Sequence, residues 1–264
     1  NDAEKKLTDK TKVIMPVHYT GGVGDLDLVY NFAIKNNLRV VEDAAHAFGT
    51  YYNNKIIGGF GDIACFSFDG IKNITSGEGG CVVSNDNSVI KKIKDARLLG
   101  VEKDTEKRFN NSRSWNFQVR NQGWRYHMSN IMAAIGLEQL KRFDELKLKR
   151  RNLAKLYDEL FSDVKNINPL IRDYENVVPH IYVIRIHKMK DRQLIIKKML
   201  EKNIQVGFHY QPNHLLEFYK DTSILPITES IFPELLSLPL HPELTKLDVK
   251  YISDSLISTL RNYD

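Results

Sequence analysis

The chain has 264 residues, of which 42% are hydrophobic and 27% charged, and its formal net charge is +5. These values are ordinary for a globular protein with one large domain or a domain and a half. No apolar run is long enough to span a bilayer and no basic-then-apolar leader opens the chain, so we expect a cytoplasmic protein without a membrane partner. The two cysteines, Cys65 and Cys81, argue against a disulfide framework and do not make a metal site.

Two basic clusters, at residues 91–94 and 147–151, allow two interpretations. They could form a nucleic-acid surface, or they could be the solvated faces of two helices. Acidic residues are interleaved with both clusters and no recognition motif accompanies them. We therefore favour solvated helix faces and expect no nucleic-acid partner, although a basic balance also suits a substrate that carries phosphates.

The first elements form a strand–helix–strand unit. Residues 13–18 read as a buried strand, residues 25–36 carry apolar side chains at helical spacing, and residues 38–42 read as a second short strand. Short links between them indicate a βαβ unit with parallel strands. Further strands are expected at 62–68 and 81–84, with helices at 90–99, at 128–140 (N-cap Ser129 or Asn130) and at 143–161.

The composition changes near residues 163–169, where we expect the α/β part to end. Beyond it, the pattern predicts strands at 180–187 and 204–210 and helices at 191–202 and 248–260. The predicted architecture is therefore a large α/β domain at 1–163, with a mostly parallel sheet and flanking helices, and a small α+β domain at 164–264.

A single lysine, Lys72, lies in an unusual setting. It follows an apolar strand that ends at Ser67, and a loop with three glycines, Gly77, Gly79 and Gly80, comes after it. Desolvation disfavours the ammonium form of lysine, so an amine held in such a setting can lose its proton and attack a carbonyl. That chemistry forms Schiff bases, including those with pyridoxal phosphate.

Other polar residues also follow predicted strands. Asp43 comes directly after one strand, Ser67 closes another, and His18 ends the first. Ligands of open parallel sheets bind outside the carboxyl ends of the strands, so Asp43, His46, Ser67 and Lys72 are expected at one crevice. Taken singly, Asp43 could be a helix cap, His46 a core histidine and Ser67 an ordinary strand-end hydroxyl; their occurrence together with Lys72 favours a site.

These motifs resemble those of the sugar aminotransferases of the DegT–StrS type, which are fold-type-I pyridoxal-phosphate enzymes acting on nucleotide-linked keto sugars. The resemblance covers nearly all of the chain. It is carried by residues 16–19, 41–47, 58–62, 65–80, 123–130, 133–136, 209–212 and 236–242.

The resemblance implies a role for each residue of the predicted crevice. Lys72 would form the Schiff base with pyridoxal phosphate and then move a proton between substrate and coenzyme, with pyridoxamine phosphate as an intermediate. Asp43 would pair with the pyridinium nitrogen, His46 would contact the ring, and Ser67 would bind the coenzyme phosphate.

The same resemblance implies partners. His127 would reach the coenzyme phosphate of a neighbouring subunit, which implies a homodimer, and His209 would lie near the sugar nucleotide. The implied reaction transfers an amino group, with glutamate as donor, to a nucleotide-linked 3- or 4-keto sugar. Amino-sugar and polysaccharide biosynthesis are the implied processes.

The sequence departs from the family pattern in two ways. Asp69 stands where a histidine or another residue often occurs, and Asn1 to Lys12 resembles a junction in the middle of the large domain, so its N-terminal segment is expected to be missing. Two alternatives to the aminotransferase follow. One is a related sugar dehydratase, in which a histidine would replace the lysine; the other is a non-catalytic remnant or regulatory partner of the same fold.

Overall fold

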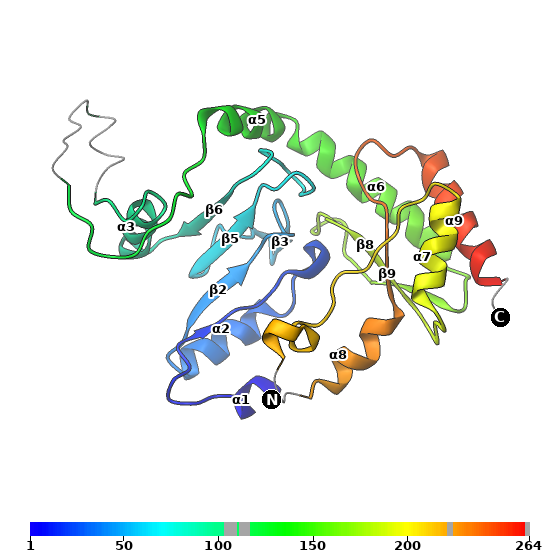
Figure 1. Cartoon of the computed structure of the whole chain (residues 1–264), viewed down its shortest axis with the longest axis horizontal. Coiled ribbons are helices and arrows are strands. Elements are labelled where there is room, and N and C mark those ends of the chain that lie inside the picture. The colour runs from blue at the N-terminus through cyan, green and yellow to red at the C-terminus, as the bar shows by residue number, and fades with distance from the viewer. Residues whose placement is uncertain (103–109, 111–116, 221–223, 262–264) are drawn as a thin grey trace. The chain divides into compact units, whose positions relative to one another are not determined.

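A computed structural model describes residues 1–102, 110, 117–220 and 224–261 (Figure 1). Contacts divide the chain into two compact units, Asn1–Phe143 and Asp144–Asp264. Composition predicted a boundary after residue 163 instead. The difference concerns helix α6 (Phe143–Phe161), whose buried side chains, such as Tyr157, belong to the core of the second unit. A helix that begins one unit and has a charged outer face gives no compositional signal at its start.

The first unit is built around a four-stranded sheet in the order β1-β2-β5-β6, and Figure 1 shows β2, β5 and β6 as neighbouring arrows. The pairings β1–β2 and β2–β5 are parallel, and β5–β6 is antiparallel. A separate antiparallel ribbon pairs β3 with β4. The bounds are α1 Asp2–Lys5, β1 Val13–Ile14, α2 Leu26–Lys35, β2 Arg39–Asp43, β3 Tyr51–Tyr52, β4 Lys55–Ile56, β5 Ile63–Ser67, β6 Gly80–Ser84, α3 Asn87–Ala96 and α5 Asn130–Lys141.

The predicted βαβ unit is confirmed, and its helix has clear local causes. Asp25 caps α2 by accepting the Leu28 N–H at 2.9 Å, and Leu26 and Ala33 are the buried side chains of the helix. Just past its end, Asn37 adopts a φ of 53°, a left-handed conformation that closes helices. The chain then returns as β2, parallel to β1.

The first strand is shorter than residues 13–18 because Pro16 has no N–H to donate to a ladder. Pairing nevertheless resumes one residue later. Asp43 donates its N–H to the Pro16 carbonyl at 2.9 Å, and His18 donates its N–H to the Asp43 carbonyl at 3.0 Å. The end of β2 is thereby held by the segment that follows the proline.

The second unit contains the antiparallel sheet β7-β8-β9. Side chains from α6, the sheet, α7 and α9 form its core, including Ile184, Met199, Leu236 and Leu256. Figure 1 shows α7 beside α9. The bounds are β7 Ile167–Pro169, β8 Tyr182–Ile186, α7 Arg192–Glu201, α8 Pro226–Ile231, β9 Leu235–Leu238 and α9 Lys246–Arg261.

The strand predicted at 204–210 is wrong. Ile204 and Val206 are buried on either side of the exposed Gln205, which is the alternation that suggested a strand. Only Gly207 pairs, through two hydrogen bonds with Ser237 of β9, one from each N–H. Alternate side chains of this segment are buried in the core, but its backbone forms no continuous strand pairing. The alternation of buried and exposed residues therefore came from burial and not from a strand.

The prediction of solvated basic faces is confirmed for the first cluster and wrong for part of the second. Lys91, Lys92 and Lys94 are exposed on α3. Arg150, by contrast, is buried and donates to the carbonyls of His180 and Leu240, each at 3.0 Å. Burial lowers the pKa of its guanidinium to about 10. Arg150 is therefore a structural donor inside the second unit.

The fold as a whole agrees with the α/β expectation. The first unit carries a mainly parallel sheet with helices, and the second is a smaller α+β unit. Within the described ranges, no helix is both long and apolar enough to cross a membrane.

Candidate active site

The ends of two neighbouring strands define the candidate site. In the parallel β2–β5 ladder, Asp43 is paired with Cys65, and β5 ends two residues later at Ser67. Asp43 is itself the last residue of β2. Because parallel strands end at the same edge of a sheet, the structure brings Asp43 and Ser67 to one edge, where ligands of such sheets bind.

Asp43 is half-buried, and its carboxylate accepts a hydrogen bond from the backbone two residues further along the chain. Its Oδ1 accepts the Ala45 N–H at 3.1 Å, so Asp43 opens a turn and caps no α-helix. A carboxylate has about four acceptor positions, so this one bond leaves capacity for a further donor. Such a donor could be a protonated ring nitrogen.

Ser67 and Asp69 lie at the end of the neighbouring strand. Ser67 is half-buried, and its Oγ accepts the Asp69 N–H at 3.3 Å. A hydroxyl that accepts one bond still has its own proton to donate. Asp69 Oδ1 in turn accepts the Ile71 N–H at 3.2 Å, which shapes the turn leading to Lys72.

Lys72 is half-buried in an ordered turn rather than fully exposed on the surface. Its N–H donates to the Asp69 carbonyl at 3.0 Å, and Ser76 N–H donates to the Phe68 carbonyl at 2.9 Å. The Thr75 hydroxyl donates to the same Phe68 carbonyl at 3.2 Å. These bonds close the loop at its base, so the backbone that carries Lys72 is held directly beyond Ser67.

Asn73 connects this loop to the loop that follows β2, and the sequence reasoning missed it. Its buried amide donates to the carbonyls of His46 and Phe48, each at 3.4 Å. The segment that carries Lys72 and the segment that carries His46 are therefore tied together. An asparagine next to a candidate nucleophile was the signal that could have pointed to it.

His46 is buried, and its ring has an assigned partner. The Thr20 N–H donates to His46 Nδ1 at 3.3 Å. With an N–H donor at Nδ1, a neutral ring carries its proton on Nε2. Thr20 was also missed, because its importance comes from its backbone and not from its side chain.

The glycine loop packs closely on the start of α5. Gly79 has a φ of +142°, and a Cβ there would lie 2.6 Å from Met128 Cε and 2.9 Å from Ser76 Oγ. Gly80 begins β6, and a Cβ there would lie 2.4 Å from the Phe66 carbonyl oxygen. The glycines are thus required by close approach of chain to chain at the carboxyl end of β5.

The two cysteines near this edge are poor nucleophiles. Burial raises the pKa of both the Cys65 and the Cys81 thiols, and neither is in a disulfide. The thiolate is the reactive form of cysteine, so these groups stay protonated at neutral pH. The amine of Lys72 is the better candidate for carbonyl attack.

Among the described residues, the structure shows no hydrogen bond or ion pair between His127 and the residues of the candidate site. His127 is exposed and lines a 710 Å³ cavity over β5, β6 and α3, together with Lys94, Arg97 and Met132. Asp43, His46 and Lys72 do not line this cavity. The expectation that His127 acts on a neighbouring subunit stays a prediction.

His209 lies in the second unit, held by β9. Its Nδ1 is 2.7 Å from Ser237 Oγ.

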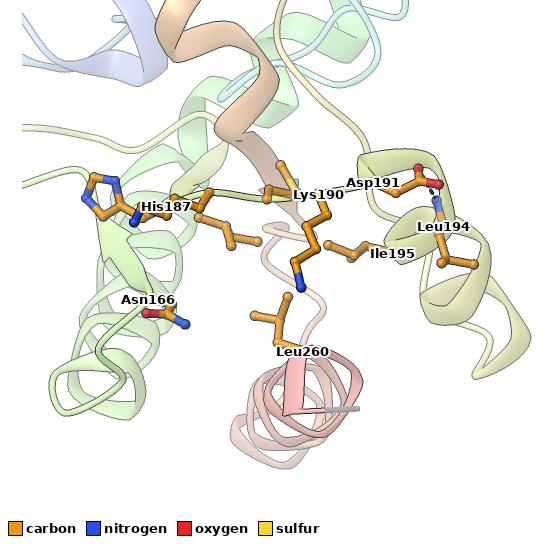
Figure 2. A pocket seen from close by; sticks show the side chains of 10 residues that line it. Asn166, His187, Lys190, Asp191, Leu194, Ile195 and Leu260 are labelled. Carbon is orange, nitrogen blue, oxygen red and sulfur yellow. Dashed lines mark hydrogen bonds between the residues drawn. The ribbon is translucent and has the colours of Figure 1, made fainter. Parts of the chain in front are cut away.

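A separate 140 Å³ cavity of this unit lies between β8 and the start of α7, and Figure 2 shows Lys190 extending between Ile195 and Leu260 within it. Ligand sites usually occupy 300–1,000 Å³, roughly, so this cavity is too small for a nucleotide-linked sugar. Across the described ranges, no cluster of three or more histidine, cysteine or acidic side chains could hold a metal.

The donor set at the sheet edge fits pyridoxal phosphate: a carboxylate for its ring nitrogen, a hydroxyl for its phosphate and an amine for its carbonyl. Asp43 and Ser67 stand at adjacent strand ends, and Lys72 follows Ser67 in the connecting loop. This fit rests on chemistry and placement, and the individual roles remain predictions.

Comparisons with known proteins agree with the fold and the motifs. An uncharacterized protein of Methanocaldococcus jannaschii is 37% identical over 94% of the chain, which spans 67% of that protein. The spore coat polysaccharide biosynthesis protein SpsC of Bacillus subtilis is 31% identical over 99% of the chain, which spans 70% of SpsC.

Solved structures give the same result. Helicobacter pylori PseC, an aminotransferase involved in the biosynthesis of pseudoaminic acid, superposes with a TM-score of 0.90 at 31% identity, over 98% of this chain and 69% of PseC. A putative sugar aminotransferase of Streptococcus pneumoniae, in its PMP-form, gives 0.89 at 29% identity, over 98% and 72%. The family model of these aminotransferases matches residues 1–257. The chain therefore belongs to the DegT/DnrJ/EryC1/StrS aminotransferase family.

Proposed function

We propose that the protein is a pyridoxal-phosphate-dependent aminotransferase that transfers an amino group, from glutamate, to a nucleotide-linked 3- or 4-keto sugar. The observation that carries the proposal is the sheet edge at which Asp43 and Ser67 end adjacent parallel strands, with Lys72 in the loop beyond Ser67. Family membership supports the reaction class. The coenzyme supplies an electron sink for the carbon that loses or gains a proton.

Each residue contributes a distinct step in this proposal. Lys72 supplies the amine that attacks the coenzyme carbonyl and later moves a proton at the substrate carbon. Asp43 stabilises a proton on the ring nitrogen, and Ser67 donates its hydroxyl to a phosphate oxygen. His46 would contact the ring through its Nε2 proton, since its Nδ1 accepts from the Thr20 N–H.

The substrate class rests on what is said of similar proteins. PseC acts in pseudoaminic acid biosynthesis and SpsC in spore coat polysaccharide biosynthesis, both of which concern sugars. A net charge of +5 also suits a substrate that carries phosphates. We place His209 near the sugar nucleotide on the resemblance alone, and location in the cytoplasm remains a prediction from the sequence.

A homodimer is part of the proposal, and the surface of α5 supports it. None of its residues is buried, and Ile131 and Leu137 are 76% and 60% exposed. Trp124 and Tyr126, stacked with ring centroids 6.1 Å apart, are exposed just before this helix. An apolar helix face with adjacent aromatic rings is typical of a surface that a second subunit covers.

Borohydride reduction tests the central assignment. We expect reduction in the presence of pyridoxal phosphate to attach the pyridoxyl group to Lys72, read by peptide mass spectrometry. Lys72→Arg keeps the positive charge but removes the nucleophilic amine, so labelling should disappear. Lys55→Arg, which alters an exposed lysine near Phe60, should leave the labelling intact. Absence of label on Lys72 with bound coenzyme would sink the proposal.

The sugar dehydratase is the competing function, and Lys72 argues against it. Turnover with glutamate against a panel of nucleotide-linked 3- and 4-keto sugars separates the two. Amination of the sugar, with 2-oxoglutarate formed in equal amount, supports the aminotransferase. Loss of a sugar oxygen without net amination supports the dehydratase. Coenzyme binding without either reaction supports a non-catalytic partner.

A further inference from the structure

A buried cluster of hydrogen-bonded side chains lies behind the candidate site. His18 Nε2 is 2.8 Å from Glu42 Oε2, and each side chain is only 1% exposed. The Tyr30 hydroxyl donates to Glu42 Oε1 at 2.6 Å, and the Asp62 N–H donates to the Tyr30 oxygen at 3.0 Å. Both oxygens of Glu42 therefore have partners, as a buried carboxylate requires.

The position of this cluster relates it to the site. Glu42 immediately precedes Asp43 on β2, and successive side chains of a strand point to opposite faces. Glu42 thus lies on the α2 side, while Asp43 lies on the other face. Burying polar side chains is costly unless each is hydrogen-bonded, so this cluster holds His18, Glu42 and Tyr30 in one fixed arrangement.

Backbone hydrogen bonds connect the His18–Glu42 pair to the turn at residues 18–21. The His18 N–H donates to the Asp43 carbonyl at 3.0 Å, so His18 is attached to β2 through both its backbone and its ring. Two residues on, Thr20 has a φ of 60° and donates its N–H to His46 Nδ1. The Gly21 carbonyl accepts the Thr50 hydroxyl at 3.1 Å. The turn that contacts His46 is thus anchored at its start by His18.

We propose that His18 and Glu42 are a positioning pair that fixes the tautomer and orientation of His46. The pair holds the turn at residues 18–21, and the turn holds the Thr20 N–H against His46 Nδ1. His46 then keeps its proton on Nε2 and presents it toward the coenzyme ring. The last step rests on the proposed function; the effect on His46 itself does not.

Histidine-selective ¹⁵N NMR of the protein without added coenzyme tests the pair. The His46 ring signals are identified by their loss in His46→Gln. In the wild type, we expect the Nε2–H tautomer. In His18→Leu, Glu42 Oε2 loses its donor while Tyr30 still donates to Oε1, and the His46 signals should shift toward those of a ring that exchanges between tautomers. In His18→Gln, the amide can still donate to Glu42, so the wild-type pattern should return.

The controls separate positioning from a general loss of structure. His241→Leu makes the same change at an exposed histidine of the second unit and should leave the His46 signals unchanged. If His18→Leu does not fold, His18→Asn replaces it, because its shorter amide cannot reach Glu42. Circular dichroism verifies the fold of each variant.

Coenzyme titration gives a second readout. The Kd for pyridoxal phosphate should rise about tenfold in His18→Leu and less than about threefold in His18→Gln. Unchanged His46 signals in a folded His18→Leu protein would overturn the positioning pair. Shifted His46 signals in a protein whose wild type binds no coenzyme would support the pair and refute the proposed function instead.

Discussion

Asp43 and Cys65 are partners in the parallel ladder between β2 and β5. This register places the end of β5 two residues beyond the end of β2, so that Asp43 and Ser67 lie at one edge of the sheet. A shift of one residue would turn every side chain of β2 to the opposite face and place Glu42 where Asp43 lies. The chemistry of the site therefore depends on a pairing between residues far apart in the chain.

Replacing Asp43 by asparagine should abolish most amino transfer while the fold persists. Asparagine can still accept the Ala45 N–H through its oxygen, but it cannot stabilise a protonated ring nitrogen. We expect kcat with glutamate to fall by about a hundredfold or more, a typical loss for an electrostatic group at a reacting centre. The matched control is Asp25→Asn, because asparagine caps a helix as well as aspartate does. Equal rates for the two variants would contradict the role of Asp43.

Replacing Gly80 by alanine should destabilise the first unit. Its Cβ would lie 2.4 Å from the Phe66 carbonyl oxygen, and neither backbone can move without breaking the β5–β6 ladder. We expect a loss of about 2 kcal/mol or more in the free energy of unfolding, measured by urea denaturation. Gly24→Ala is the control, because nothing lies within 4 Å of a Cβ at that position. The prediction fails if both variants unfold at the same urea concentration.

The ion pair between Arg39 and Asp62 should make stability depend on pH in the acid range. Arg39 Nε and Nη2 contact the two carboxylate oxygens at 2.7 and 2.6 Å. Hydrogen bonding to Arg39 lowers the pKa of Asp62 below its usual range. The folded pKa is depressed, so the contribution is complete above the unfolded value of about 3.9 and is lost as pH falls through the folded value.

Measurement of this effect compares the wild type with Arg39→Gln. The difference in their free energies of unfolding should be constant above about pH 5 and should shrink below about pH 4. Lys155→Gln, which removes an exposed pair with Glu175, is the control and should cost less than about 1 kcal/mol at neutral pH. A difference for Arg39→Gln that stays constant down to pH 2 would be incompatible with this account.

Charges on the apolar face of α5 should prevent dimer formation. Ile131→Glu and Leu137→Glu would each place a carboxylate in the proposed interface, where burying an unpaired charge is costly. Sedimentation analysis should show a monomer for either variant and a dimer for the wild type. Ile171→Glu changes a side chain that is 95% exposed in the second unit, and this control should remain dimeric. A wild type that sediments as a monomer at micromolar concentration would contradict the proposed interface.

Local signals predicted the elements that have local causes. Ser129 caps α5, as one of the two cap positions that the sequence indicated, because a cap needs only a side-chain oxygen and an N–H three residues on. The turn that carries Lys72 was also visible, since glycines and hydroxyl residues follow the end of a strand. The motifs at 41–47 and 65–80 sufficed to predict the family, which the comparisons confirm.

Such local patterns did not predict contacts between residues that are far apart in the chain. Residues 204–210 alternate as a strand does, yet only Gly207 pairs, because its partner Ser237 lies on β9. Arg150 looked like part of a solvated face, yet its buried guanidinium donates to the carbonyls of His180 and Leu240. Periodicity reports which side chains are buried and does not report what lies opposite them.

Sequence patterns alone identified the candidate nucleophile, Lys72, and the residues expected to act with it, because each lies beyond a predicted strand in a recognisable motif. The structure was needed to show that Asp43 and Ser67 share a sheet edge, that Asn73 links the loops after β2 and β5, and that His18 pairs with Glu42. All three relationships depend on hydrogen bonds between segments distant in the chain, which form only when the strands are paired in this register.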